Sequence, residues 1–300
     1  MSKIKTTDLT KGPILKTLTK LALPIMASAF LGTAYNITDM AWIGMLGSRA
    51  VAGVGVGGMY LWLSQGLVSL ARMGGQVNVS QCCGKGDHKA AIDYAGASLQ
   101  LTVIFGILFS AVCLIFLNPL INFFNLNDAQ TYSYAKGYMI ITCGLIIFSY
   151  LNFTLTGLFT AQGDSKTPFI ANLAGLVMNM IFDPLLILGV GPFPRLEVVG
   201  AAIATVGAQI LTFAIMLFRS GTDGNLLKEV RFFSRVPRSY YSSICRIGVP
   251  TALQGSLYCM ISMVLTRMVA GFGPGAVATQ RVADRLNLLA GIQQTASALP

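Results

Sequence analysis

Long runs of apolar residues without charges dominate this sequence and constrain what it can fold into. Short polar breaks separate the runs, and most of them exceed the roughly 18 residues that indicate a membrane-spanning helix. Charged residues make up 11% of the 300 residues, against about 25% in soluble domains. The pattern excludes an ordinary soluble enzyme, a disordered chain and a coiled coil. It predicts an all-α integral membrane protein, a polytopic helical bundle with about eight transmembrane helices.

Charged and turn-forming breaks set the bounds of the expected helices. Several are longer than the about 20 residues that a span needs, so tilt or extension beyond the bilayer is expected. A short interfacial piece is expected at Pro119–Phe124, after the third span. The expected spans are Ile14–Leu46, Val51–Cys82, Ala91–Leu117, Tyr132–Phe159, Thr167–Leu188, Gly200–Phe218, Tyr240–Phe272 and Ala276 to the end of the sequence.

Basic residues are shared unequally between the two sides of these spans. If the spans alternate, one side receives the N-terminal lysines and the basic loops around Lys85 and Arg231, whereas the other receives Arg49, Lys136 and Arg195. The positive-inside rule then places the N-terminus in the cytoplasm of a multi-pass protein of the inner (plasma) membrane. The same rule accounts for the net charge of +10, so nucleic acid is not expected as a partner.

An internal repeat connects the two ends of the sequence. Lys20–Val56 aligns without a gap on Arg246–Val282, which places Pro24 on Pro250, and both segments reach Gly-x-x-Ala-Val-Ala at the following break. This pattern predicts a duplicated bundle of six helices in a parallel repeat, as in several transporter folds. Three parts are therefore expected, listed in chain order: a six-helix N-terminal lobe at 1–220, a cytoplasmic linker at 221–239, and the first two helices of an incomplete second repeat at 240–300.

Two carboxylates deep in separate apolar runs are functional candidates. A charge at the bilayer centre costs about 2.5–3.5 kcal/mol on insertion scales, so an ionisable residue there indicates a functional site. Tyr35 precedes Asp39 by one helical turn, and Asn179 precedes Asp183 in the same way. Pro184 has no N–H and so frees a backbone carbonyl one turn earlier. These oxygens suit Na+, and either carboxylate could carry a proton instead.

Other polar side chains are expected to line a cavity if the first, fifth and sixth spans pack together. The alternative is that they only hydrogen-bond helices to one another. The expected lining residues are Asn36, Gln65, Asn152, Asn172 and Gln209. Arg72 is in line with Gln65 and Gln76 on the second span, and it is expected to snorkel to the cytoplasmic surface in preference to pairing with a carboxylate.

The eighth span carries Asp284 beside Arg281 and Arg285, where a structural ion pair and a substrate site are equally compatible with the sequence. The one histidine, His88, lies in a polar loop, and the six cysteines have no metal-binding or redox spacing. No catalytic residue, structural metal or cofactor is therefore expected.

Two loop motifs and the carboxylate motifs resemble the multidrug and toxic compound extrusion (MATE) family. The segment 161–168, Ala-Gln-Gly-Asp-Ser-Lys-Thr-Pro, is similar to the family's cytoplasmic turn after the fourth span. Gly75-Gln76-Val77 is similar to another family motif. Asp39 and Asn179-x-x-x-Asp183-Pro184 resemble its N-lobe cation site, and the acidic positions are most similar to the DinF-like branch.

The resemblance implies twelve helices in two lobes around a central cavity, so the chain is expected to stop after eight of them. It implies alternating-access antiport, in which organic-cation drugs or toxins leave across the cytoplasmic membrane in exchange for H+ or Na+. Small amphipathic cations are the implied substrates, and the full-length protein is expected to be a monomer among membrane lipids. The implied ion-coupling residues are Asp39, Asp183, Asn179, Tyr35 and Thr205, of which the first three could hold Na+.

Two other functions stay open from the residues themselves. A flippase for lipid-linked precursors or polysaccharides would keep the architecture but should carry several Lys or Arg residues in its cavity. A membrane receptor without transport fits the size of the chain, although the repeat and the buried carboxylates disfavour it. An enzyme is not expected, because the spans hold no histidine cluster and no nucleophile motif.

Overall fold

The computed structural model describes residues 14–126, 128–189, 194–221, 225–230, 236–272, 275–276, 279–280 and 283. Inside the first helix, the side chains of residues 14–25, 28–29 and 35 lie outside this description. All regular elements in the described part are helical. They are α1 (Ile14–Gly44), α2 (Ser48–Lys85), α3 (His88–Ile115), α4 (Leu117–Asn122), α5 (Ala129–Gly144), α6 (Ile146–Ala161), α7 (Lys166–Leu188), α8 (Glu197–Ser220), the 3-10 helix η1 (Leu226–Glu229) and α9 (Arg238–Ala270).

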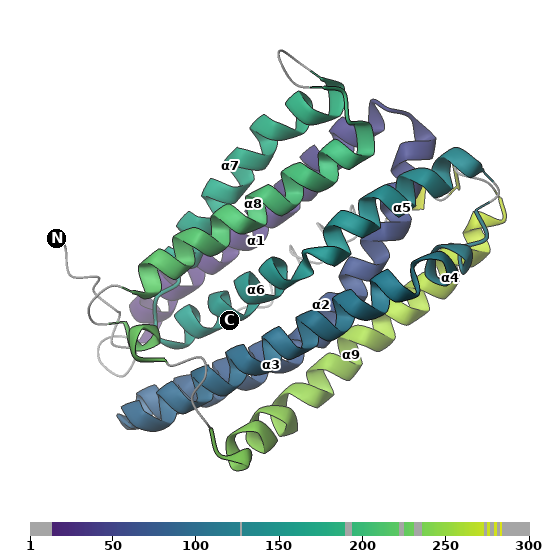
Figure 1. Ribbon diagram of the computed structural model, residues 1–300. Helices are drawn as coiled ribbons and strands as arrows, with labels where there is room; N and C mark the ends of the chain where they lie inside the picture. Colours follow the sequence, from purple (N-terminus) through teal and green to yellow (C-terminus); the bar gives the residue numbers. More distant parts are fainter. Residues whose placement is uncertain are drawn as a thin grey trace.

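The long helices lie side by side along one direction in a bundle (Figure 1). Helices α1, α7 and α8 pack together on one side, and α2, α3 and α9 pack together on the other. The pair α5–α6 lies between them and contacts both α2 and α8. This arrangement brings six segments of the chain around a common interior, which holds the site described below.

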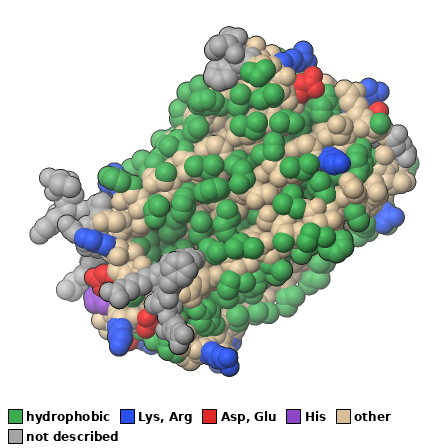
Figure 2. Space-filling view, in the orientation of Figure 1, with side chains coloured by type: hydrophobic (Ala, Val, Ile, Leu, Met, Phe, Trp, Pro, Cys, Tyr) green, Lys and Arg blue, Asp and Glu red, His purple; other side chains and the backbone are tan. Residues whose placement is uncertain are grey.

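The protein is a polytopic membrane helical bundle, as predicted. Within the described residues, five helices are long and apolar enough to cross a membrane, or six if the bent pair α5–α6 is one span. Figure 2 shows hydrophobic side chains over the middle of the molecule and charged side chains near its two ends. The predicted span 167–188 and the interfacial piece after the third span are close to α7 and α4. The predicted eighth span lies almost entirely outside the described residues.

The predicted span Tyr132–Phe159 is not one straight helix. Helices α5 and α6 meet at an angle of 51°. Leu145 lies between them, as the C-cap of α5 and the N-cap of α6. No proline lies at this position, and the bend was therefore not predicted. The hydroxyl of Ser110 in α3 donates to the carbonyl of Gly144 at 3.2 Å, so a backbone acceptor at the break keeps a partner.

The turn between α6 and α7 is fixed by the motif singled out in the sequence. Gly163 has a φ of 81°, a left-handed conformation that favours glycine. The Asp164 carboxylate accepts from the backbone N–H groups of Lys166 and Thr167, both at 3.1 Å, and so caps the start of α7. The Gln162 side chain accepts from the backbone N–H of Leu226 at 3.1 Å, which ties this turn to η1 in the predicted linker.

Helix α9 packs closely against α2, and glycines at the contact allow it. A Cβ on Gly74 would overlap the backbone carbonyl of Ile244, and a Cβ on Gly248 would overlap that of Leu70. Ser243 donates its hydroxyl to the side-chain oxygen of Asn78 at 3.0 Å beside this contact. The first helix after the predicted linker is therefore held directly against the second helix of the chain.

Candidate functional site

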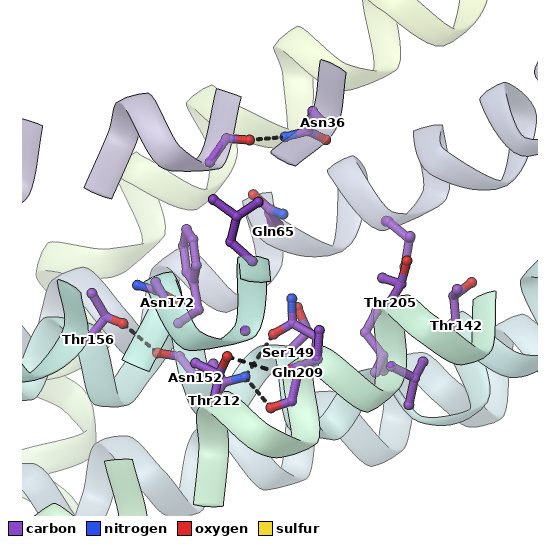
Figure 3. A pocket seen from close by; sticks show the side chains of 18 of the residues that line it. Asn36, Gln65, Thr142, Ser149, Asn152, Thr156, Asn172, Thr205, Gln209 and Thr212 are labelled. Carbon is purple, nitrogen blue, oxygen red and sulfur yellow. Dashed lines mark hydrogen bonds between the residues drawn. The ribbon is translucent and has the colours of Figure 1, made fainter. Parts of the chain in front are cut away.

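A cavity of about 620 Å³ lies inside the bundle, between α1, α2 and the helices from α5 to α8. Its volume is in the range of sites that take drug-sized ligands, roughly 300–1,000 Å³. The three spans predicted to form a pocket, now α1, α7 and α8, all contribute to it. Helices α2, α5 and α6 complete the wall, so the pocket is broader than predicted. Figure 3 shows polar side chains from several helices directed toward its interior.

All five predicted cavity-lining residues lie on this wall: Asn36, Gln65, Asn152, Asn172 and Gln209. Asn36 also donates to the carbonyl of Gly32 in its own helix at 2.7 Å. Thr156 and Thr212 bond carbonyls one turn earlier in their helices, at 2.8 and 2.9 Å. The wall is thus polar at scattered points and apolar between them, which suits an amphipathic ligand.

The two candidate carboxylates come from helices in contact, α1 and α7. Asp183 and Asn179 have no exposed surface, and Asp39 is 8% exposed. Asn179 donates its side-chain nitrogen to Asp183 Oδ1 at 3.0 Å. Asp39 lies close enough to Asp183 for the two carboxylates to interact electrostatically. The structure therefore brings together three residues that the sequence placed on two separate spans.

Several oxygens in this region are buried without a hydrogen-bond partner in the described part of the chain. They include Asp183 Oδ2, Asn179 Oδ1 and Thr205 Oγ1. Leaving a buried acceptor unsatisfied is costly, more so when it is charged. A proton or a small cation such as Na+ would remove that cost. Two carboxylates and an amide oxygen are the hard oxygen ligands that such a cation prefers.

The carboxylates differ in their relation to the cavity. Asp39 and Thr205 line it, whereas Asn179 and Asp183 do not. Asn172, one of the predicted lining residues, is on the same helix and does line the cavity. The wall includes only the part of α7 nearer its N-terminus, and Asn179 and Asp183 on the later turns have no exposed surface. Asp39 is thus the member of the acidic group that faces the cavity.

Other predicted positions fall outside the description or elsewhere in the cavity. The side chain of Tyr35 and the residues Arg281, Asp284 and Arg285 lie outside the described residues. Arg72 was expected to reach the cytoplasmic surface, and this is wrong. Its guanidinium lies over the ring of Phe153 at 4.2 Å and lines the cavity, because α6 packs against α2 at this level.

Comparison with known sequences identifies the family. A sequence model described as MatE matches residues 24–185. The chain belongs to the MatE family. The resemblance inferred from the motifs is thereby confirmed, while the assignment to the DinF-like branch stays a prediction.

Relatives of this MatE chain are named for multidrug resistance or for transport. It is 30% identical over 280 residues to the "Probable multidrug resistance protein NorM" of Thermotoga maritima, covering 90% of this chain and 58% of the relative. It is 26% identical over 278 residues to the "FAD transporter" of Shewanella oneidensis, covering 93% of this chain and 61% of the relative. The chain therefore spans about three fifths of the length of these curated relatives.

The fold is that of solved MATE structures. The structure titled as the outward-facing conformation of a multidrug resistance MATE family transporter of the MOP superfamily has a TM-score of 0.83 to this chain at 24% identity. The match covers 97% of this chain and 64% of that one.

Sequence reasoning missed much of the MatE cavity wall contributed by α6. Ser149, Asn152, Thr156 and Thr160 all line the cavity. Their spacing follows one face of a helix, so a polar stripe in an otherwise apolar run was the available signal. Only Asn152 of this stripe was predicted from the sequence.

Proposed function

We propose that this MatE chain belongs to a cation-coupled antiporter that exports amphipathic organic cations across the cytoplasmic membrane by alternating access. The observation that carries the proposal is the position of Asp39. Its carboxylate lines the cavity and also interacts with the fully buried Asp183–Asn179 pair. One side chain is therefore available to both a cargo and a coupling ion.

The coupling role follows from competition for that charge. A proton or Na+ held by Asp39 and Asp183 neutralises the group and weakens its attraction for a cationic cargo. Release of the ion restores the attraction. Such exchange drives transport only if the ion binds the inward-open and outward-open states with different affinity. Asn179 and Thr205 supply buried oxygens for the ion, and Tyr35 is proposed as a further ligand on α1.

The orientation and the division into lobes are part of the proposal. Lys85 ends α2, Lys166 begins α7, and Lys228 lies in η1 after α8. Arg49 and Arg195 lie near the opposite ends of these helices, at the starts of α2 and α8. This asymmetry supports a cytoplasmic N-terminus by the positive-inside rule. Helices α1 to α8 would form the N-terminal lobe, residues 221–239 the linker, and α9 the first helix of the second lobe.

The charges on the cavity wall favour cationic cargo over the pyrophosphate of a lipid-linked precursor. Among the described lining residues Arg72 is the single base, whereas a flippase for such a precursor needs several. One relative is named as an FAD transporter, so the named cargoes of the relatives are not restricted to drugs. A receptor without transport would give no functional role to the buried Asp39–Asp183 pair.

The decisive test is efflux of a fluorescent organic cation from vesicles that contain this protein. A pH jump and a Na+ jump, applied separately, identify the coupling ion. Asp39→Asn should abolish the ion-driven flux while the protein remains folded. Asp93→Asn removes a carboxylate from α3, outside the cavity wall, and should transport normally. Normal ion-driven flux in the Asp39 variant would contradict the proposal.

A further inference from the structure

Arg72 occupies an unusual position for a basic residue in a membrane bundle. It lies in the second half of α2, with its guanidinium 4.2 Å from the centre of the Phe153 ring. Its Nε is buried and has no hydrogen-bond partner among the described residues, and no carboxylate in that part of the chain forms an ion pair with it. An arginine cannot shed its proton in a protein, so this charge persists.

The surroundings of Arg72 are built to leave room for it. A Cβ on Gly157 of α6 would approach Arg72 Cγ to 2.9 Å and Gln76 Oε1 to 3.2 Å. The absence of a side chain there lets Arg72 and Gln76 of α2 lie against α6. Gln76 Oε1 is itself buried without a partner in the described residues. Two polar side chains with unused bonding capacity thus lie one helical turn apart on the same wall.

Among the described residues that line the cavity, one acid and one base carry a charge, Asp39 and Arg72. Asp39 lies near the C-terminal end of α1, the end from which α2 begins, whereas Arg72 lies toward the opposite end of α2. The two charges are therefore placed at different depths of one elongated wall. A buried guanidinium without a counter-ion is unfavourable, and an acidic group from a ligand would remove that penalty.

We propose that Arg72 binds an acidic group on the cargo and so determines whether the cavity prefers an acid to its neutral ester. A carboxylate or sulfonate would pair with the guanidinium, and the aromatic frame that carries it would lie along Phe153. The cationic end of the same molecule would lie toward Asp39. The inference rests on the proposed function, since it assumes that the cavity holds the transported compound.

The alternative is that stacking on Phe153 only fastens α2 to α6. A cation–π contact can be structural. A purely structural role does not require Arg72 to line a cavity. With such a role, removing the charge of Arg72 would leave the preference for acidic ligands unchanged. The two roles therefore differ in a measurable quantity, the discrimination between an acid and its ester.

The experiment compares tetramethylrhodamine, which carries a free carboxylate, with its methyl ester. Binding of each dye to the purified 300-residue protein is followed by fluorescence polarisation, and the ratio of the two affinities is compared between variants so that partition of the ester into detergent cancels. The wild-type protein should prefer the acid. Arg72→Gln should lower the acid-to-ester ratio about tenfold, in keeping with the loss of one charge-assisted contact. Arg72→Lys keeps the charge and should retain part of the preference.

Arg246→Gln is the matched control, because it removes the same charge from an exposed position on α9 away from the cavity wall. It should leave the ratio at the wild-type value. The inference is overturned if the wild-type protein does not prefer the acid, or if Arg72→Gln leaves the acid-to-ester ratio unchanged. It is also overturned if Arg72→Gln and Arg246→Gln lower that ratio equally. Ion-driven flux of the ester tests the proposed export separately, so failure of one does not imply failure of the other.

Discussion

Asn152 of α6 donates its side-chain nitrogen to two oxygens of Gln209 in α8, the backbone carbonyl at 2.8 Å and the side-chain carbonyl at 2.7 Å. Both residues line the cavity, and Figure 3 shows the pair bridging the two helices. These hydrogen bonds between two neutral side chains therefore join α6 to α8 at the cavity wall.

Replacing Asn152 should weaken the bundle modestly. Hydrogen bonds between membrane helices contribute about 0.6 kcal/mol on average, and Asn152→Ala removes two of them, so a loss of about 1 kcal/mol is expected. The measurement is a lower Tm in a fixed detergent. Asn36→Ala is the control, since its described bond stays within α1. Equal Tm losses in the two variants would refute a bridging role.

Asn179 should act on the ion and not on the cargo. Asn179→Ala removes a buried oxygen that could bind Na+, so with Na+ as the coupling ion the concentration that gives half-maximal flux should rise about tenfold. With H+ as the coupling ion that concentration should fall instead, because the variant also loses the donor that stabilises the ionised Asp183. Asn172→Ala lies on the same helix but lines the cavity, so it should change the cargo KM instead. The assignment fails if the two variants affect both quantities alike.

The contact between α2 and α9 should not tolerate a methyl group. Gly248→Ala places a Cβ onto the carbonyl of Leu70 and should cost about 1–3 kcal/mol through forced separation of the helices. Gly84→Ala, at an exposed position of α2 with open space around it, should be neutral or slightly stabilising. Chemical denaturation of both variants gives the comparison. A stable Gly248 variant would show that the helices approach less closely.

The start of α5 should make stability depend on pH. The side chain and the backbone N–H of Thr131 donate to the Asp128 carboxylate at 2.7 and 2.9 Å, and with Arg49 beside it they hold the pKa of that carboxyl below its usual value. The stabilisation is therefore complete above about pH 3.9, the ordinary Asp pKa, and is lost as the pH falls through the lower folded pKa.

The expected signature is a Tm difference between wild type and Asp128→Ala that is constant near neutral pH and shrinks in acid. Asp128→Ser keeps a capping hydroxyl without a charge, so its difference from Asp128→Ala should not vary with pH. A wild-type advantage that persists in strong acid would exclude the carboxylate as its source.

The sequence predicted helix positions well where local chemistry marks the ends. The start of α7 follows Asp164, which caps it, and its end precedes Gly189 with a φ of 72°. The bend at Leu145 was missed because no proline or polar run signals it. Helical periodicity puts Asn172 and Asp183, about three turns apart on α7, on one face of that helix. It could not tell that the cavity reaches only the first of them, since that depends on how neighbouring helices pack.

The described cavity wall is drawn from one uninterrupted stretch of sequence, Leu31 to Thr212. Exchanging that single segment with a relative should therefore move the ligand preference, provided that Leu70 and Gly74 of α2, which α9 contacts, are kept. Selection can retune the wall through substitutions scattered over six helices while the glycine contact between α2 and α9 is left alone. Different side chains of α2 serve the cavity and the contact with α9, so substitutions in one set can accumulate without a change in the other.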